Sequence, residues 1–121
     1  MDRRKRRIEQ GETILGIELG STRIKAVLID SHNEPIAQGG HTWENQLLDG
    51  VWTYSLEAVE EGLQAAFKSL NDDIKAQYNV VLKRTKAMAV SAMMHGYLVF
   101  DDADNLLVPF RTWRNTMTER A

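Results

Sequence analysis

The sequence predicts an α/β domain in which a three-stranded antiparallel meander precedes a helix and a parallel strand. Three short apolar runs separated by turn residues lie within the first 42 residues, a pattern typical of consecutive strands. A longer segment with apolar residues at helical spacing follows them. After it comes a run of small and apolar residues, typical of a strand that is buried on both faces and parallel to its neighbour.

The first two strands are predicted over residues 14–19 and 24–29 and form a hairpin. A turn over residues 31–35, marked by serine, asparagine and proline, leads to a third strand over residues 36–42, which two consecutive glycines weaken. Residues 43–53 show no regular pattern, and we expect them to be irregular.

The helix is predicted to begin after Ser55, whose side chain can cap its first turn. Apolar residues recur at helical spacing as far as Leu70. The polar residues that follow either end the helix or allow it to continue toward Tyr78. The fourth strand is predicted over residues 86–93, and residues 97–108 read as an extended segment, an acidic turn and a returning segment.

Composition and charge limit the classes of partner. The chain of 121 residues has the length of one domain, with 43% hydrophobic and 26% charged residues. Its formal net charge of −2 favours neither nucleic acid nor membrane as a partner, and no apolar run approaches the ~20 residues that span a bilayer. The absence of cysteine excludes disulfides and thiolate metal sites and agrees with a cytoplasmic location.

The start of the chain carries a run of consecutive cations at residues 3–7. Such a run can contact nucleic acid or acidic lipid, but it is more often a solvated tail. We therefore expect residues 1–12 to form a basic, disordered lead-in and the folded domain to span residues 13–121.

The tip of the first hairpin has the composition of a phosphate site. Its small, hydroxylated and cationic residues are Gly20, Ser21, Thr22, Arg23 and Lys25. A glycine lets an anion approach the backbone, N–H groups and hydroxyls can donate to it, and a lysine adds a point charge. Glu18, on the strand that enters the turn, could hold a hydrated magnesium ion against the same phosphates. An ordinary turn can also have this composition, so the residues alone leave both interpretations open.

A second group of polar and aromatic residues follows the fourth strand. Its members are Met94, His95, Gly96, Trp113, Arg114 and Asn115. In open α/β sheets ligands bind beyond the carboxyl ends of the strands, and planar polar groups beside an aromatic plane suit a sugar. A loop histidine, a core tryptophan and a surface arginine are the ordinary alternatives for the same residues.

Three motifs together resemble the N-terminal part of an FGGY-type carbohydrate kinase. Residues 18–25 are similar to the first phosphate motif of the sugar kinase, Hsp70 and actin superfamily, Asp-x-Gly-Thr-(Ser/Thr)-x-x-(Arg/Lys), with Glu for Asp and Ser for Thr. Residues 91–96 are similar to the Ser-Gly-Gln-Met-His-Gly of xylulokinases. Residues 109–115 are similar to the family's Pro-x-(x)-x-Trp-x-Asp segment. The order and separations of the motifs also match the family.

The resemblance implies a ribonuclease-H-like (actin-like ATPase) fold and transfer of the ATP γ-phosphate to a hydroxyl of a pentulose or related sugar. It implies that Gly20, Ser21, Thr22 and Lys25 bind the nucleotide phosphates and that Glu18 faces Mg²⁺. It further implies a sugar pocket lined by Met94, His95, Gly96, Trp113, Arg114 and Asn115. The chain departs from xylulokinases in having Trp-Arg-Asn for Trp-Asn-Asp, and in residues 50–55, where relatives carry a Trp-x-Glu-Gln-x-Pro type sequence.

The resemblance also implies what this chain lacks. Family members are around four times as long, and their catalytic aspartate, second phosphate loop and adenine pocket lie beyond the matching part. We expect an incomplete sheet, no catalytic base within the chain, no activity of the chain alone, and self-association through unpaired strand edges. The alternative is a non-catalytic domain of the same superfamily that binds nucleotide or sugar without turnover.

Overall fold

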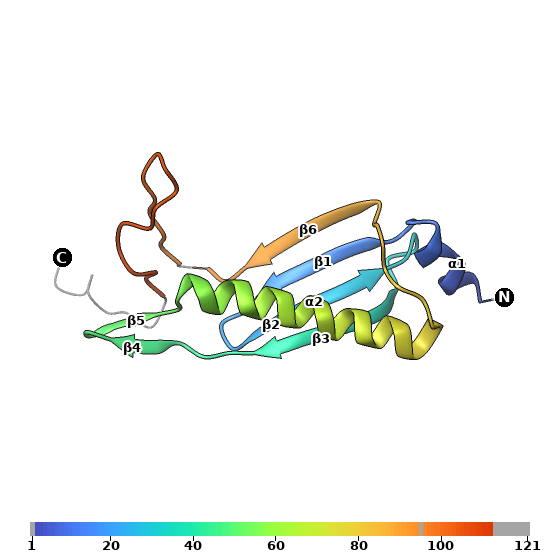
Figure 1. The fold of residues 1–121 in the computed structure, drawn as a ribbon, viewed down its shortest axis with the longest axis horizontal. Coiled ribbons are helices and arrows are strands. Elements are labelled where there is room, and N and C mark those ends of the chain that lie inside the picture. Colours follow the sequence, from blue (N-terminus) through green and yellow to red (C-terminus); the bar gives the residue numbers. More distant parts are fainter. Residues whose placement is uncertain (1, 95, 113–121) are drawn as a thin grey trace.

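The computed structural model describes residues 2–94 and 96–112 of the chain. The helices and strands follow each other as α1 (Arg3–Glu9), β1 (Ile14–Leu19), β2 (Arg23–Ile29), β3 (Pro35–Thr42), β4 (Gln46–Leu48), β5 (Val51–Thr53), α2 (Leu56–Tyr78) and β6 (Ala87–Ala92). Figure 1 shows the helix α2 lying along one face of a sheet, with α1 at one end of that sheet and β4 and β5 at the other.

The main sheet has four strands in the order β3-β2-β1-β6. The strand β1 pairs antiparallel with β2 and parallel with β6, and β2 pairs antiparallel with β3. The predicted meander and the parallel strand that follows the helix are therefore confirmed. A parallel neighbour needs a long crossover connection, and α2 supplies it.

The helix α2 follows the longer of the two predicted courses. The Ser55 hydroxyl accepts a hydrogen bond from the Ala58 N–H at 3.0 Å, and Asn79 ends the helix in a left-handed conformation with φ of 55°. Its buried residues, spaced four apart, are Gly62, Ala66, Leu70, Ile74 and Tyr78. Leu56 and Phe67, which the apolar pattern places on the buried face, are exposed instead.

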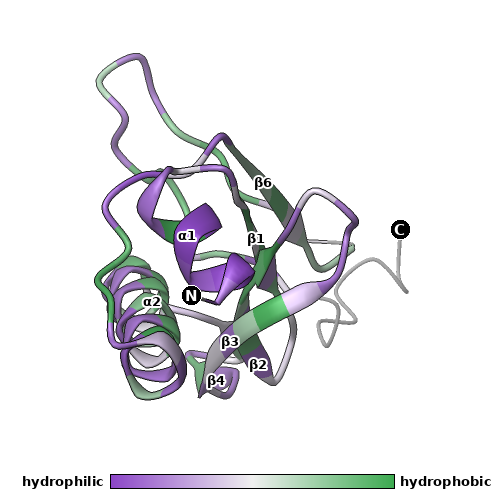
Figure 2. Cartoon of the chain, turned by 90° about the vertical axis from the view of Figure 1, so that its right-hand side faces the viewer, coloured by the Kyte–Doolittle hydropathy of each residue, from purple (hydrophilic) through white to green (hydrophobic). Residues whose placement is uncertain are grey.

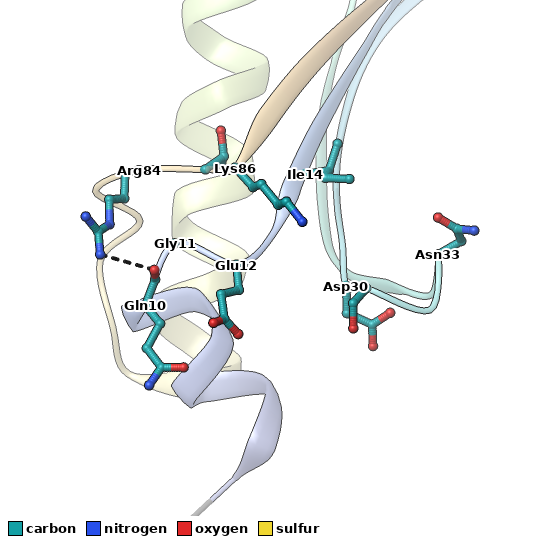
Figure 3. A pocket seen from close by; sticks show the side chains of 10 residues that line it. Gln10, Gly11, Glu12, Ile14, Asp30, Asn33, Arg84 and Lys86 are labelled. Atoms are coloured by element: carbon teal, nitrogen blue, oxygen red, sulfur yellow. Dashed lines mark hydrogen bonds between the residues drawn. The ribbon is translucent and has the colours of Figure 1, made fainter.

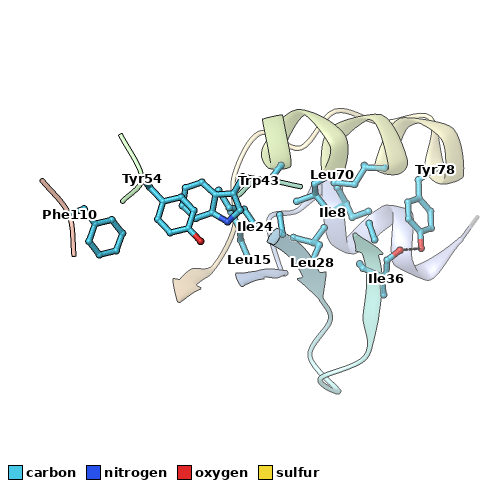
Figure 4. Packing of buried hydrophobic residues seen from close by; sticks show 14 residues of the cluster. Ile8, Leu15, Ile24, Leu28, Ile36, Trp43, Tyr54, Leu70, Tyr78 and Phe110 are labelled. Carbon is cyan, nitrogen blue, oxygen red and sulfur yellow. Dashed lines mark hydrogen bonds between the residues drawn. The ribbon is translucent and has the colours of Figure 1, made fainter. Parts of the chain in front are cut away.

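The hydrophobic core lies between α2 and one face of the sheet. Leu15, Ile24 and Leu28 are buried there, and Figure 4 shows them beneath Leu70 of the helix. The helix approaches β3 closely at Gly39, where an added Cβ would lie 2.2 Å from the Leu70 nitrogen. Only glycine can occupy that position without separating the helix from the sheet.

The strand β6 corrects one expectation. The sequence predicts burial on both faces, but all six residues of β6 are exposed. The reason is its position at the end of the strand order, because no described strand or helix lies beyond it. In Figure 2 this apolar strand forms an uncovered edge of the sheet.

The expected disordered lead-in is also corrected, because Arg3–Glu9 form the helix α1. Asp2 caps it by accepting a hydrogen bond from the Arg4 N–H at 2.9 Å. Ile8 is only 1% exposed and joins the hydrophobic core. The Arg7 guanidinium lies 3.5 Å from the buried Asp30 carboxylate. One buried apolar residue and two ion pairs, the second between Arg4 and Glu34 at 3.7 Å, therefore dock a helix whose composition is otherwise that of a solvated tail.

Residues 43–53 are not wholly irregular, because β4 and β5 form a short hairpin within them. Asp49 and Gly50 occupy its turn with φ angles of 50° and 79°. An Asp-Gly pair is the favoured sequence for a two-residue hairpin turn of this kind, since both central residues need positive φ. That pair is the sequence signal that identifies the hairpin.

After β6 the chain forms an extended two-stranded arm as far as residue 112. Isolated antiparallel bridges join Tyr97 to Arg111 and Phe100 to Leu106. The two segments on either side of the predicted acidic turn therefore lie side by side. The Asp101 side chain accepts hydrogen bonds from the backbone N–H groups of Ala103 and Asn105. Within the described part of the chain, no helix has the length and apolar character needed to cross a membrane.

Candidate functional site

The parallel pairing of β1 and β6 brings two predicted motifs to one edge of the sheet. Leu19 lies opposite Ala92, and the Met93 N–H donates to the Leu19 carbonyl at 2.9 Å. The hairpin tip begins at Gly20, so it lies beside the point where β6 ends. Met94 follows directly and is 76% exposed. Ligands bind at such an edge in α/β sheets.

The hairpin turns tightly at Gly20. The Gly20 N–H donates to the Arg23 carbonyl at 2.9 Å. A Cβ added to Gly20 would lie 2.7 Å from that same carbonyl oxygen, which is closer than real Cβ contacts allow. Any other residue must therefore distort the turn, and glycine also leaves its outer surface open to a ligand.

Glu18 and Lys25, two of the three charged residues of the first motif, lie side by side beneath the tip. Glu18 is the cross-strand partner of Lys25 on β2 and of Ser91 on β6. Both charged side chains are exposed, and neither makes an ion pair with another described residue. A Cβ on Gly20 would lie 3.7 Å from the Glu18 Oε1 atom, so this carboxylate reaches the turn.

An aromatic cluster behind the hairpin tip was not predicted as part of the site. Trp43 and Tyr54 stack with ring centroids 4.0 Å apart, and Phe110 lies 5.7 Å from Tyr54. Figure 4 shows the three rings in a row that extends the core toward the arm. Both Trp43 and Tyr54 bind backbone carbonyls of the tip. The two rings come from the segment around β4 and β5, where the sequence shows no motif.

The predicted sugar-binding residues are only partly within the described structure. Met94 and Gly96 lie at the sheet edge and the start of the arm, and Phe110 packs near Gly96. His95, Trp113, Arg114 and Asn115 lie outside the described residues. The last described residue, Thr112, donates to the Trp52 carbonyl at 3.4 Å, so the described arm ends at the same end of the sheet as the hairpin tip.

A pocket of about 570 Å³ opens at the opposite end of the sheet, where α1 docks. Figure 3 shows Gln10, Glu12, Asp30 and Lys86 around it, and Arg84 donating to the Gln10 carbonyl. No residue of the predicted phosphate or sugar motifs lines this pocket. It therefore lies apart from the candidate site.

The described residues contain no group of three or more side chains of the kinds that usually ligate metals. Glu18 at the hairpin is thus a single carboxylate. Magnesium is commonly held by one or two carboxylates together with water and substrate phosphates. The single carboxylate at the tip fits this kind of site, and it does not fit a site in which protein side chains supply all the ligands.

Comparison with known families identifies the domain. The model of the N-terminal domain of the FGGY family of carbohydrate kinases matches residues 13–121. The xylulose kinase of Haemophilus influenzae is 26% identical over 110 residues, which are 86% of this chain and 22% of that protein. The chain therefore spans about a fifth of the length of this curated relative.

Solved structures agree on the fold. A xylulose kinase from Brucella ovis aligns with a TM-score of 0.74 at 22% identity, over 89% of this chain and 22% of that one. A Plasmodium falciparum glycerol kinase with ADP aligns with a TM-score of 0.64 at 17% identity, over 89% of this chain and 21% of that one. The fold is thus part of the actin-like ATPase fold, as the sequence motifs predict.

Proposed function

Because this chain belongs to the FGGY family of carbohydrate kinases, we propose that its parent protein transfers the γ-phosphate of ATP to a hydroxyl of a pentulose or a related sugar. The observation that carries the proposal is the parallel pairing of β1 and β6, which aligns the hairpin tip with Met94 at one sheet edge. Phosphoryl transfer depends on positioning and charge stabilisation, and a phosphate motif beside a sugar motif meets that need.

The roles at the hairpin follow from its chemistry. Ser21 and Thr22 would donate to the phosphates, and Lys25 would add a positive charge to them. Gly20 would let the phosphate approach the backbone. Glu18 would hold Mg²⁺, which neutralises phosphate charge when bound. The exposed and unpaired state of Glu18 and Lys25 supports these roles, because both are available to a ligand.

The sugar would be held at the end of β6. Six residues carry this role in our proposal: Met94, His95, Gly96, Trp113, Arg114 and Asn115. Relative to the Trp-Asn-Asp of xylulokinases, the Trp-Arg-Asn sequence places a cation where they have a neutral amide, at residue 114, and an amide where they have a carboxylate, at residue 115. Because the motifs resemble those of xylulokinases and a curated relative is a xylulose kinase, a pentulose is the first class to test, and the panel extends to related ketoses.

The 121-residue chain alone should be inactive. Asp30 lies at the opposite end of the sheet from the tip, and Asp101 lies at the turn of the arm, so neither is placed to serve as the base. The chain corresponds to 22% of a curated relative. We propose that the catalytic base and the ADP-binding half are supplied by sequence beyond residue 121.

We place the protein in the cytoplasm, where ATP is abundant, and expect no nucleic-acid or membrane partner. The lack of cysteine and the net charge of −2 support this placement. The expected self-association of the isolated chain is argued below from β6.

The test is ADP release by the natural full-length product against a panel of ketoses. We expect release with one ketose and none from the 121-residue chain. A Gly20→Asp variant should lose the activity, because it adds bulk and negative charge where the phosphate binds. The control is Val81→Asp, which adds the same negative charge at a side chain that is 64% exposed and lies outside the candidate site.

Two results would count against the proposal. Turnover by the isolated chain would show that it holds its own base. Nucleotide binding by the full-length product without ADP release for any sugar would favour a non-catalytic domain, and Glu18→Asp would then be the first change to examine.

A further inference from the structure

Three consecutive carbonyl groups of the hairpin tip, those of Gly20, Ser21 and Thr22, accept hydrogen bonds from Trp43 and Tyr54 of the aromatic cluster. The Trp43 indole N–H donates to the Gly20 carbonyl at 2.8 Å, and the Trp43 backbone N–H donates to the Thr22 carbonyl at 3.1 Å. The Tyr54 hydroxyl donates to the carbonyl of the residue between them, Ser21. The side chains of Trp43 and Tyr54 thus bind two consecutive carbonyls, those of Gly20 and Ser21, and the Trp43 backbone binds the next one.

The direction of the Tyr54 hydrogen bond is determined by its partners. A carbonyl oxygen can only accept, so the hydroxyl proton of Tyr54 points to Ser21. The Asn45 amide nitrogen donates to the same hydroxyl oxygen at 3.1 Å. An accepted hydrogen bond polarises a hydroxyl and strengthens the one it donates. Asn45 therefore supports the contact between Tyr54 and the hairpin.

The orientation of the tip carbonyls also determines the direction of the N–H groups in the same peptide units. In a planar trans peptide the C=O and the following N–H point in opposite directions. With the Gly20 and Ser21 carbonyls turned toward the aromatic cluster, the N–H groups of Ser21 and Thr22 point away from it. Neither of these two N–H groups donates to an acceptor among the described residues.

We propose that Trp43 and Tyr54 are positioning residues that hold the hairpin tip in the orientation that binds phosphate. This inference rests on the proposed function of the hairpin. A rotated peptide would present a carbonyl oxygen to the anion, which repels it, instead of an N–H group, which binds it. Preorganised donors bind a ligand more effectively, because no free energy is spent on orienting them when the ligand binds.

The burial of the two rings makes them suitable for this role. Tyr54 is 2% and Trp43 7% exposed, and the two stack on each other. Neither ring can turn away without opening the core beneath it, so both donors stay at the tip. A serine or lysine on the surface would bind the same carbonyls with far more freedom.

The test compares two tyrosine variants that each lose one hydroxyl bonded to a backbone carbonyl. Tyr54→Phe removes the hydrogen bond to Ser21. Tyr78→Phe is the matched control, because the Tyr78 hydroxyl donates to the Ile36 carbonyl at 2.7 Å, far from the tip. The 121-residue chain is titrated with magnesium tripolyphosphate while the amide resonances of Ser21 and Thr22 are followed by NMR.

The wild-type chain should shift both amide resonances on titration. Tyr54→Phe should bind about fivefold more weakly, as the loss of one oriented hydrogen bond predicts, and its ligand-free Ser21 and Thr22 resonances should move. Tyr78→Phe should keep the wild-type affinity even if it lowers the midpoint of urea unfolding. Trp43→Phe, which keeps an aromatic ring but loses the indole donor, should behave like Tyr54→Phe.

The outcomes distinguish the positioning role of Trp43 and Tyr54 from the binding of phosphate at the hairpin tip. Wild-type affinity in both Tyr54→Phe and Trp43→Phe would overturn the positioning role and leave the phosphate site standing. Equal weakening in Tyr54→Phe and Tyr78→Phe would also overturn it, since general destabilisation would then explain the loss. A wild-type chain whose tip resonances do not respond would overturn the phosphate site, and the positioning role with it.

Discussion

Asp30 organises the turn between β2 and β3 and links it to α1. Its Oδ1 atom accepts hydrogen bonds from the N–H groups of His32 at 2.8 Å and Glu34 at 3.1 Å. Its Oδ2 atom lies 3.5 Å from Arg7. Burial by itself would raise the pKa of Asp30, but the two N–H groups and the arginine outweigh it and hold the pKa below the usual 3.8.

This depressed pKa predicts acid sensitivity. The folded state binds the Asp30 proton less tightly than the unfolded chain does, so the stabilisation is present above the unfolded pKa of about 3.8. It is lost as the pH falls through the lower, folded pKa. We expect Asp30→Asn to unfold at lower urea concentration at pH 7 and to lose less stability than wild type on acidification below about pH 4.

Urea unfolding at a series of pH values measures this effect. Asp102→Asn, at an exposed position of the arm, is the control and should follow the wild-type curve at every pH. Parallel curves for wild type and Asp30→Asn would show that the carboxylate charge adds nothing to the folded state.

At the scale of the element, α1 shows how few contacts can dock a helix. It has seven residues, and a helix of that length is not stable alone in water. Ile8 in the core, the ion pair of Arg7 with Asp30, and the hydrogen bond from Arg84 to Gln10 hold it in place. The helix precedes residue 13, where the family match begins.

Ile8→Ala should lower the free energy of unfolding by about 2–4 kcal/mol, the range for removing a buried isoleucine side chain. The measurement is urea unfolding followed by circular dichroism. Val81→Ala, at a side chain that is 64% exposed, is the matched control and should change stability by less than about 0.5 kcal/mol. An unchanged midpoint for Ile8→Ala would favour the disordered lead-in that the sequence predicts.

At the scale of the whole molecule, the sheet is covered by α2 on one face only. Gly16, Glu18, Lys25, Val27 and Ala89 share the opposite face, over which no described helix lies. The edge strand β6 adds exposed apolar side chains, with Met88 62% and Val90 59% exposed. An exposed apolar edge with unpaired backbone groups favours pairing with another chain.

The isolated chain should therefore self-associate through β6. We expect its mass in light scattering to rise with concentration, and Val90→Lys to return it toward the monomer, because edge lysines oppose strand pairing. Val81→Lys introduces the same charge at another exposed valine, outside any strand, and should associate like wild type. A monomeric wild-type chain at every concentration would contradict this expectation.

Much of the framework follows from local sequence. The bounds of β1 were predicted to the residue, and β2 and β3 each begin one residue earlier than predicted. The Ser55 cap and the parallel course of β6 were also predicted. At the candidate site, the turn at Gly20 was recognisable from its residues, whereas the pairing of β1 with β6, which sets the tip beside the end of β6, was not predicted.

The sequence by itself determined the four strands of the main sheet, the start of α2 and the motifs at the sheet edge, because hydrophobic periodicity, capping and turn preferences act between residues close in the chain. Only the tertiary structure decided that α1 docks, that β6 is exposed, and that the carbonyls of the hairpin tip face Trp43 and Tyr54. The docking of α1 and the orientation of the tip carbonyls depend on contacts between residues 21 or more positions apart, such as Thr22 with Trp43 and Ser21 with Tyr54. Local preference carries no signal for such pairs, since each forms only when the folded chain brings both partners together.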